Sequence, residues 1–263
     1  MHREQRFKIV IFILSVLLIA VSSALIFLLT KRAAVKKIPE VAVPVKGKIA
    51  IVIDDWGYNL DNQYILEQIK YPFTASVLPR LYYSKEISAQ LHKLGFQVIL
   101  HLPTEPHEKY RLEKNTILTS MGEQAIINII AQDLADIHFA IGVSNHMGSK
   151  ATEDLRTMST VLNELKKRNL FFLDSRVSPK TICSNLAARL HVGFAKRDIF
   201  LDNKEEAEYI KGQIYKLKRK AQMYGYAIGI GHDRKITLEV LKATMPELER
   251  EGYKFVFVSE LVK

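Results

Sequence analysis

The sequence contains a single cysteine, Cys183, among 263 residues. One cysteine cannot form a disulfide within the chain, so a disulfide framework is excluded. The sequence also has no internal repeat and no low-complexity tract. What remains is an ordinary globular composition, 48% hydrophobic, with enough apolar residues to bury the core of one or two domains.

Phosphate-binding glycine motifs are missing too. No G-x-G-x-x-G follows the first expected strand and no Walker A loop occurs, which disfavours nucleotide binding. Residues 1–37 contain seven Lys or Arg and one Glu, so this segment supplies +6 of the net charge of +10. The rest of the chain has no basic block with interleaved aromatic residues. We therefore expect no nucleic-acid partner.

Charged residues are absent from Ile9 to Thr30, where Leu, Ile, Val, Phe and Ala dominate. As a helix this run spans about 33 Å, enough to cross a hydrocarbon core of about 30 Å. A cleaved signal peptide is the alternative, because residues 22–24 (Ser-Ser-Ala) are small. The run is longer than the usual apolar region of about 7–15 residues in signal peptides. We expect residues 9–30 to form an uncleaved, single-pass membrane anchor.

The flanks of the anchor are basic on both sides, so the positive-inside rule does not fix its orientation. The tail 1–8 is short and a large domain follows. We expect a cytoplasmic tail and an exported domain, in the periplasm or on the outer face of the cell membrane. Residues 31–47, with Pro39 and Pro44 and no periodicity, are predicted to be a linker. The domain is predicted to span residues 48–263.

Short apolar runs alternate with helical patterns throughout this domain. The first run, 49–53, is apolar and mostly β-branched, as is typical of a buried parallel strand. Further strands are expected at 73–78, 96–100, 137–143, 170–173, near Phe194, 226–230 and 255–258. Helices are expected at 60–70, 84–94, 122–136, 152–168, 183–190, 204–224 and 237–251. Repeated βα units predict a parallel sheet with helices outside, and both a barrel and an open doubly wound sheet fit.

Side chains able to bind metal or transfer protons follow most of the expected strands. Functional groups of parallel β/α folds gather at the carboxyl ends of the strands. The residues in this position are Asp54, Asp55, His101, Asn145, His146, Asp174, Arg197, Asp198, Asp202 and His232. Each alone is compatible with a turn or a helix cap, and for Asp174 and Asp198 that reading stays open. Together they predict one shared site.

Histidine and carboxylate ligands suit zinc or a similar first-row metal, and three protein ligands leave a position open for water. Such a metal lowers the pKa of water and polarises a carbonyl. Side chains of adjacent residues diverge in an extended strand. We therefore expect one of Asp54 and Asp55 to be a ligand and the other a nearby base. His232, from across the rim, is placed to protonate a leaving group.

Six motifs, in this order, resemble the divergent polysaccharide deacetylase family. They are Ile-Val-Ile-Asp-Asp-Trp-Gly (51–57), His-Leu-Pro-Thr-Glu-Pro (101–106), Asn-His-Met-Gly-Ser (145–149), Phe-Phe-Leu-Asp-Ser-Arg (171–176), Arg-Asp-Ile-Phe-Leu-Asp (197–202) and Ala-Ile-Gly-Ile-Gly-His (227–232). The resemblance covers residues 48–263. It implies a distorted parallel β/α barrel of about seven or eight strands, as in NodB-type carbohydrate esterases.

Those esterases remove an N- or O-acetyl group from a polysaccharide with a metal held by one Asp and two His. Carried over, the resemblance makes Asp54 the base, Asp55 a metal ligand and His232 the acid. NodB-type enzymes take both metal histidines from one His-x-x-x-His segment, which this sequence lacks. His101 and His146 are the expected replacements. The substrate-lining Arg-x-Pro-Tyr motif is also absent, so the metal site transfers better than the substrate.

We therefore expect a membrane-anchored, zinc-dependent deacetylase of an N-acetylated cell-envelope glycan, for which peptidoglycan is one candidate. Asp55, His101 and His146 hold the metal, Asp54 is the base and His232 the acid. Asn145, Asp174, Arg197, Asp198 and Asp202 support them. One alternative is a glycosidase that pairs Asp54 with Asp174 or Asp198, about 5–9.5 Å apart. The other is a non-catalytic, metal-containing glycan-binding or scaffold module. No particular protein partner is predicted.

Overall fold

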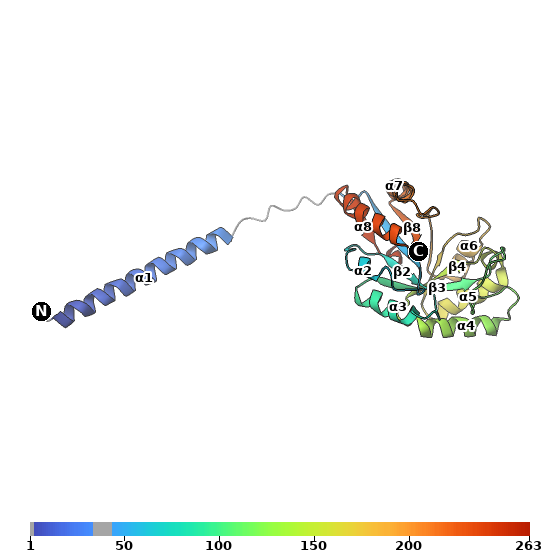
Figure 1. Cartoon of the computed structure of the whole chain (residues 1–263), viewed down its shortest axis with the longest axis horizontal. Coiled ribbons are helices and arrows are strands. Elements are labelled where there is room, and N and C mark those ends of the chain that lie inside the picture. The colour runs from blue at the N-terminus through green and yellow to red at the C-terminus, as the bar shows by residue number, and fades with distance from the viewer. Residues whose placement is uncertain (1–2, 34–43) are drawn as a thin grey trace. The chain divides into compact units, whose positions relative to one another are not determined.

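The computed structural model describes residues 3–33 and 44–263, which fall into two compact units divided between Val43 and Pro44 (Figure 1). The described part of the first unit is helix α1 (Arg3–Ala33). Its segment Arg3–Leu28 is long and apolar enough to cross a membrane. The expected apolar helix is therefore present, as a membrane anchor or a signal sequence. It extends beyond the expected 9–30 because the flanking Lys and Arg are good helix formers. Residues 34–43 of the expected linker lie outside the described residues.

The second unit contains one curled sheet of parallel strands. They are β1 (Gly47–Trp56), β2 (Thr74–Val77), β3 (Gln97–Thr104), β4 (Gly142–Met147), β5 (Phe171–Asp174), β6 (Phe194–Lys196), β7 (Ile199–Phe200), β8 (Tyr226–His232) and β9 (Tyr253–Val256). Their order is β6-β5-β4-β3-β2-β1-β8-β7, and β9 pairs with β1. This is the predicted distorted parallel β/α barrel, in the form of a curled half-barrel.

Helices surround the sheet on its outside (Figure 1). They are α2 (Gln63–Leu66), α3 (Ser84–Lys93), α4 (Glu123–Asp136), α5 (Leu155–Lys167), α6 (Cys183–Leu190), α7 (Ala207–Tyr224) and α8 (Lys235–Arg250), with 3-10 helices η1 (Ala151–Glu153) and η2 (Val258–Leu261). The larger core cluster joins them to the outer face of the sheet. A smaller cluster joins residues on the inner face, among them Ala50, Val52, Ile99 and Ile230. All the described buried core residues lie in this unit, so we expect residues 44–263 to fold without α1.

The two edges of the sheet are bridged by one short segment. Its first part, β6, pairs with β5, and its second part, β7, pairs with β8. Only Arg197 and Asp198 lie between these strands. The N–H of Arg197 donates to the carbonyl of Asp174 at 3.0 Å, and that of Asp198 donates to the carbonyl of Ile228 at 2.8 Å. The single strand expected near Phe194 is thus two short strands that span the seam.

Several expected boundaries are wrong. The fourth strand begins at Gly142 rather than at residue 137, because the apolar residues before it pack as a loop against the outer core. The helix expected at 60–70 shortens to α2. Strands also continue past the apolar runs, because polar side chains on their inner face point into the curl. Asp54, His101 and His146 therefore lie inside β1, β3 and β4 rather than after them.

Candidate metal centre

Alternation along the strands brings the candidate residues together. The inner face of β1 carries Ala50 and Val52, and the next residue of the same parity is Asp54. In the same way Ile99 precedes His101 in β3, and Ile230 precedes His232 in β8. Because side chains two residues apart point to one face of a strand, these polar groups follow the inner core toward the carboxyl ends of the strands. Parallel register brings these ends together at one rim, with Asp54 directly beside His232.

Asp55 reaches the same side through a local distortion of β1. The register with β2 shifts between Ile53 and Trp56, and Asp55 has a φ of 67°, in the left-handed region. Both carboxylates now face one imidazole: Asp54 Oδ2 lies 3.7 Å and Asp55 Oδ1 3.3 Å from His101 Nε2. Adjacent side chains diverge in a regular strand, whereas this bulge turns both carboxylates toward His101. Asp55 belongs to the group of side chains with metal-ligand spacing, and Asp54 lies outside it.

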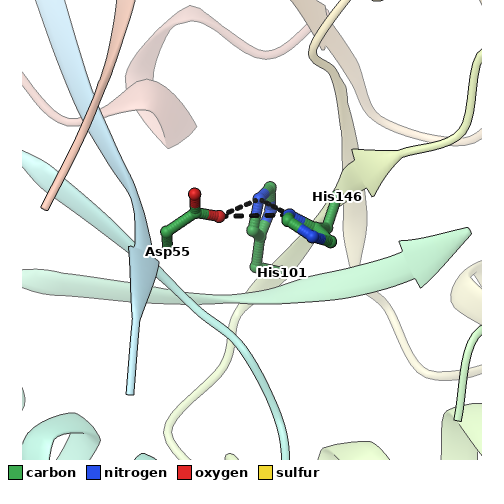
Figure 2. Close-up of side chains that lie close together, drawn as sticks. All are labelled: Asp55, His101 and His146. Carbon is green, nitrogen blue, oxygen red and sulfur yellow. Dashed lines mark hydrogen bonds and ion pairs between the residues drawn. The ribbon is translucent and has the colours of Figure 1, made fainter. Parts of the chain in front are cut away.

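Three potential ligand atoms form a nearly equilateral triangle (Figure 2). Asp55 Oδ1 lies 3.3 Å from His101 Nε2 and 3.1 Å from His146 Nδ1. The two nitrogens are 3.2 Å apart. Among residues 3–33 and 44–263, this is the one group of at least three His, Cys, Asp or Glu side chains with metal-ligand spacing.

The triangle fits a tetrahedral metal site. Ligand atoms bound to zinc at about 2.0–2.1 Å in tetrahedral geometry are separated by about 3.3 Å. Asp55 Oδ1, one of the three triangle atoms, is also buried without a hydrogen-bond partner. Burial acts to raise the pKa of Asp55, but the two neighbouring imidazoles hold that pKa well below its ordinary range. An ionised carboxylate with two imidazole nitrogens is a donor set suited to zinc or a similar divalent metal.

A pair of buried serines orients His101 behind the triangle. His101 Nδ1 lies 2.8 Å from Ser144 Oγ, which lies 2.6 Å from Ser76 Oγ. If His101 donates through Nδ1, its Nε2 keeps the lone pair that a ligand needs. Sequence reasoning did not single out these serines. The signal that could have found Ser144 is its place on β4, two residues before His146 and hence on the same face.

Asp54 is a buried carboxylate beside the triangle. Its side chain is 2% exposed and its Oδ1 has no hydrogen-bond partner. Burial raises the pKa of Asp54, although His101 and His232 act in the opposite direction. A carboxylate with a raised pKa is a stronger base, provided that the pH is high enough to keep it ionised. The position and environment of Asp54 therefore suit a general base.

His232 forms a second His–carboxylate arrangement with Asp202. His232 Nδ1 lies 2.8 Å from Asp202 Oδ1, and the backbone N–H of His232 donates to Asp202 Oδ2 at 2.8 Å. Thr237 Oγ1 donates to the same Oδ2 at 2.7 Å. Burial acts to lower the pKa of His232, but Asp202 outweighs it and the pKa is raised. His232 is thus held in a form that keeps its proton to higher pH.

A stack of planar groups fixes the other side of this imidazole. The Phe200 ring lies 5.8 Å from the His232 ring with an interplanar angle of 15°, and Arg197 Cζ lies 3.6 Å from the Phe200 centroid. Arg197 also donates from Nε to the carbonyl of Ser175 at 2.6 Å. Burial lowers the pKa of Arg197 to about 10, at which it is still cationic at neutral pH. Sequence reasoning missed Phe200, which no motif distinguishes from a core phenylalanine.

The remaining expected supporting residues have separate environments. Asn145 Oδ1 accepts from the N–H of Ser175 at 2.9 Å and braces the ends of β4 and β5. Asp174 accepts from the N–H of Arg176 at 2.7 Å and from Thr181 Oγ1 at 2.8 Å. Burial raises its pKa. Asp198 accepts from the N–H of Ile228 at 2.9 Å and pairs with Lys220 at 3.5 Å. Its described contacts do not join it to the rim site.

A groove of about 600 Å³ is lined by residues near the ends of two strands that carry the metal triangle. Tyr58, three residues after Asp55, and Pro103, two residues after His101, both line it. Tyr58 Oη donates to Glu113 Oε1 at 2.6 Å, which ties the segment after β1 to the long loop after β3. Further lining residues are Tyr82, Arg111 and Lys114. The segments that follow β1 and β3 therefore line one groove.

Most of the chain matches a known protein family. The family model described as divergent polysaccharide deacetylase matches residues 51–262. The chain is 36% identical over 196 residues to the uncharacterized protein YibQ of Escherichia coli K12, covering 74% of this chain and 61% of that protein's length.

Solved structures share the fold. The uncharacterized protein ATU2773 of Agrobacterium tumefaciens C58 has a TM-score of 0.80 at 21% identity, covering 85% of this chain and 92% of that one. The catalytic domain of a peptidoglycan N-acetylglucosamine deacetylase from Eubacterium rectale has a TM-score of 0.53 at 17% identity, covering 83% and 93%. A CE4 family pseudoenzyme from Bacillus anthracis has a TM-score of 0.50 at 14% identity, covering 83% and 66%.

Proposed function

Because the chain belongs to the divergent polysaccharide deacetylase family, we propose that it is a metal-dependent hydrolase that deacetylates an N-acetylated cell-envelope glycan. The observation that carries the proposal is the convergence of Asp55, His101 and His146 into a metal-sized triangle with Asp54 at 3.7 Å from His101. The residues proposed as base, metal ligands and proton donor lie at one rim. That combination is what hydrolysis of an amide requires.

We infer that Asp55, His101 and His146 hold the metal, with zinc as the proposed ion. A divalent metal held there supplies Lewis acidity toward a water molecule and toward the acetyl carbonyl. The chain's own contribution is to keep Asp55 ionised and to fix the His101 ring through Ser144. Buried ligands with fixed orientation hold a metal more tightly than mobile surface ligands do.

Asp54 is the proposed general base. Its buried carboxylate removes a proton from the attacking water, and its raised pKa increases its proton affinity at that step. His232 is the proposed general acid. Asp202 holds Nδ1, which leaves Nε2 as the nitrogen that donates a proton to the departing amine. The raised pKa of His232 keeps that proton available near neutral pH.

The glycan is proposed to lie in the groove that the segments after β1 and β3 line. Tyr58 and Tyr82 line this groove and are 50% and 90% exposed, so their rings are free to pack against a sugar face. Arg111 and Lys114 offer donors to hydroxyl or acidic groups. We further infer that residues 9–30 anchor the protein and that the tail 1–8 is cytoplasmic. The domain 48–263 then acts outside the cytoplasmic membrane, where such glycans occur.

The glycosidase alternative has weaker support. It needs a second catalytic carboxylate across the scissile bond from Asp54. The Asp174 carboxylate already accepts from Arg176 and Thr181, and Asp198 is paired with Lys220. A non-catalytic glycan-binding module keeps one supporting observation, the missing Arg-x-Pro-Tyr motif, and a pseudoenzyme shares the fold. The fold alone does not decide between binding and catalysis.

The test separates all three functions. Purified residues 44–263 are incubated with peptidoglycan and with chitooligosaccharides, and released acetate and new reducing ends are measured on the same samples. Deacetylation predicts acetate that disappears with a chelator and returns with added zinc, without new reducing ends. Reducing ends without acetate would establish a glycosidase. Glycan binding by the zinc-loaded protein with neither product would contradict the enzymatic proposal.

A further inference from the structure

A second and larger cavity lies along the seam of the barrel, away from the metal triangle. Its volume is about 1000 Å³, within the range of small-molecule sites. Two of its lining residues, Tyr226 and Ile228, precede His232 in β8 by six and four positions, about 20 and 13 Å along a strand. None of the metal-triangle residues lines it. We call this cavity the seam groove.

The seam groove follows from the way the sheet is bridged. Segment 194–200 pairs first with β5 and then with β8, so β6 and the first half of β8 diverge below the crossing at Arg197 and Asp198. Asp198 takes the place of a strand partner there. Its Oδ2 accepts from the N–H of Ile228 at 2.9 Å, and its own N–H donates to the Ile228 carbonyl at 2.8 Å. Helices α6 and α7 form the walls, since residues of both line the cavity.

The charge in the seam groove is strongly one-sided. Arg176, Lys196, Lys220 and Lys263 line it, together with His191, against one acidic side chain, Asp198. Asp198 is already committed to Ile228 and to Lys220. Among the described residues, Arg176 and Lys196 have no carboxylate within 4 Å, and Lys263 Nζ lies over the Tyr226 ring at 4.9 Å. Three cations from separate parts of the chain therefore line one cavity without an ion pair within 4 Å among the described residues, and Arg176 also acts on the nearby Asp174 carboxylate.

The same groove also has apolar and aromatic lining residues. Its apolar and aromatic lining residues are Ala187, Ala188, Val192, Phe194, Leu261, Ile228, Tyr224 and Tyr226. The Tyr224 side chain is 66% exposed, which is a large solvent-facing apolar surface for a residue at a cavity wall. A ligand complementary to this groove has an apolar body and an anionic group. A phosphate matches several converging cations better than a carboxylate, because it offers three acceptor oxygens and a charge of up to two.

We propose that the seam groove binds an amphiphile that carries a phosphate group. The apolar part lies against the apolar lining residues between α6 and α7, and the phosphate pairs with Arg176, Lys196 and Lys263. The proposal is independent of deacetylase activity, because the groove shares none of the metal-triangle residues. Two sources offer this chemistry, namely a phospholipid of a membrane and a soluble lipid phosphate.

The test uses residues 44–263 and octyl phosphate below its micelle concentration, with binding followed by titration calorimetry. Inorganic phosphate and octyltrimethylammonium are the comparison probes, since each carries one half of the proposed ligand chemistry. We expect one saturable site for octyl phosphate and affinities at least about tenfold weaker for both comparison probes. An Asp55→Asn protein is expected to bind octyl phosphate like the unaltered domain.

Charge reversal locates the site. Lys196→Glu combined with Lys263→Glu is expected to weaken octyl phosphate binding about tenfold or more, because both side chains are exposed lining residues of the groove. The matched control is Lys93→Glu combined with Lys254→Glu, two exposed lysines outside the groove, with unchanged binding expected. Thermal unfolding of both variants verifies that they fold. No saturable binding, or equal binding by both double variants, would overturn the proposal.

Vesicles distinguish the two sources. Sedimentation of the domain with phosphatidic acid vesicles but not with phosphatidylcholine vesicles, lost on reversal of Lys196 and Lys263, would identify a membrane phospholipid. Octyl phosphate binding without vesicle sedimentation would identify a soluble lipid phosphate. Both results are consistent with an amphiphile bound in the seam groove and differ only in its source.

Discussion

Two His–carboxylate arrangements lie at the same rim and differ in the hydrogen-bond partners of their carboxylates. In the triangle of Asp55, His101 and His146, the ligand atom Asp55 Oδ1 is buried without a hydrogen-bond partner. In the pair of Asp202 and His232, the fully buried carboxylate accepts from the backbone and side chain of His232 and from Thr237. The same residue types thus leave one cluster open to a cation and the other already satisfied.

The electrostatics follow the same division. Burial acts to raise the pKa of both Asp55 and Asp202, and the adjacent histidines outweigh it, so both pKa values are lowered. The charge of Asp202 is balanced by protonated His232, because Asp202 raises the pKa of that histidine. Asp55 faces two imidazole nitrogens that point at one another across 3.2 Å, and a metal ion can neutralise it there. Asp55 and Asp202 are the same residue type. The number of hydrogen bonds that each carboxylate accepts distinguishes the proposed metal ligand from the partner of a protonated histidine.

The largest effect is expected from Asp55→Asn, which removes the charged ligand. Acetate release from peptidoglycan should fall about a thousandfold or more, because activation of water and carbonyl depends on the metal. The matched control is Asp61→Asn, an exposed aspartate in the loop that follows β1, with unchanged activity expected. Full activity in Asp55→Asn would remove the triangle from the reaction.

A smaller effect with a distinct pH signature is expected from Asp202→Asn. In the native protein the Asp202 carboxylate raises the pKa of His232, so the protonated acid persists as pH rises and is lost only above that raised value. The variant should lose about a hundredfold in kcat, and the alkaline limb of its pH profile should move to lower pH. Metal content should stay unchanged. An unmoved alkaline limb would show that another group supplies the proton.

The acid limb of the same profile reports the base. Burial raises the pKa of Asp54, so the ionised base is lost, as pH falls, at a higher pH than for an ordinary aspartate. Asp202→Asn should move this limb less than the alkaline limb, because Asp202 acts on Asp54 only through His232. One profile of kcat against pH therefore reports on both groups, Asp54 through its acid limb and His232 through its alkaline limb.

The smallest effect is expected from Ser144→Ala, which removes the partner of His101 Nδ1 at 2.8 Å. Metal affinity, measured by competition with a chelator, should weaken about tenfold, the lower end of the range for groups that orient metal ligands. Thr237→Val is the matched change at the other cluster, because Thr237 donates to Asp202 at 2.7 Å. It should leave metal affinity unchanged. Equal weakening by both variants would show a general loss of packing.

Much of this site could be predicted from the sequence because strand periodicity is local. Apolar runs that end in Asp54, His101 and His232 identify the carboxyl ends of three strands, and parallel register then brings those ends to one rim. The resemblance to the deacetylase family is confirmed by the match over residues 51–262. The apolar N-terminal helix is likewise present, and it is long and apolar enough to cross a membrane.

What the sequence did not reveal depends on tertiary contacts. The left-handed φ of 67° at Asp55 is unusual for a residue other than glycine, and only the shifted register beside β2 shows why both carboxylates face His101. Ser76 and Ser144 look like ordinary strand serines until they meet at 2.6 Å. Asp198 follows an expected strand yet bonds to Ile228 along the seam, because the chain crosses between two sheet edges there.

The most direct test of the account measures metal bound to residues 44–263 by elemental mass spectrometry, for the native domain, His146→Ala and His232→Ala. The account predicts close to one zinc per native domain, a loss of that metal in His146→Ala, and native content in His232→Ala. Metal retained in His146→Ala, or lost equally in both variants, would contradict the assignment of one cluster to a cation and the other to a proton.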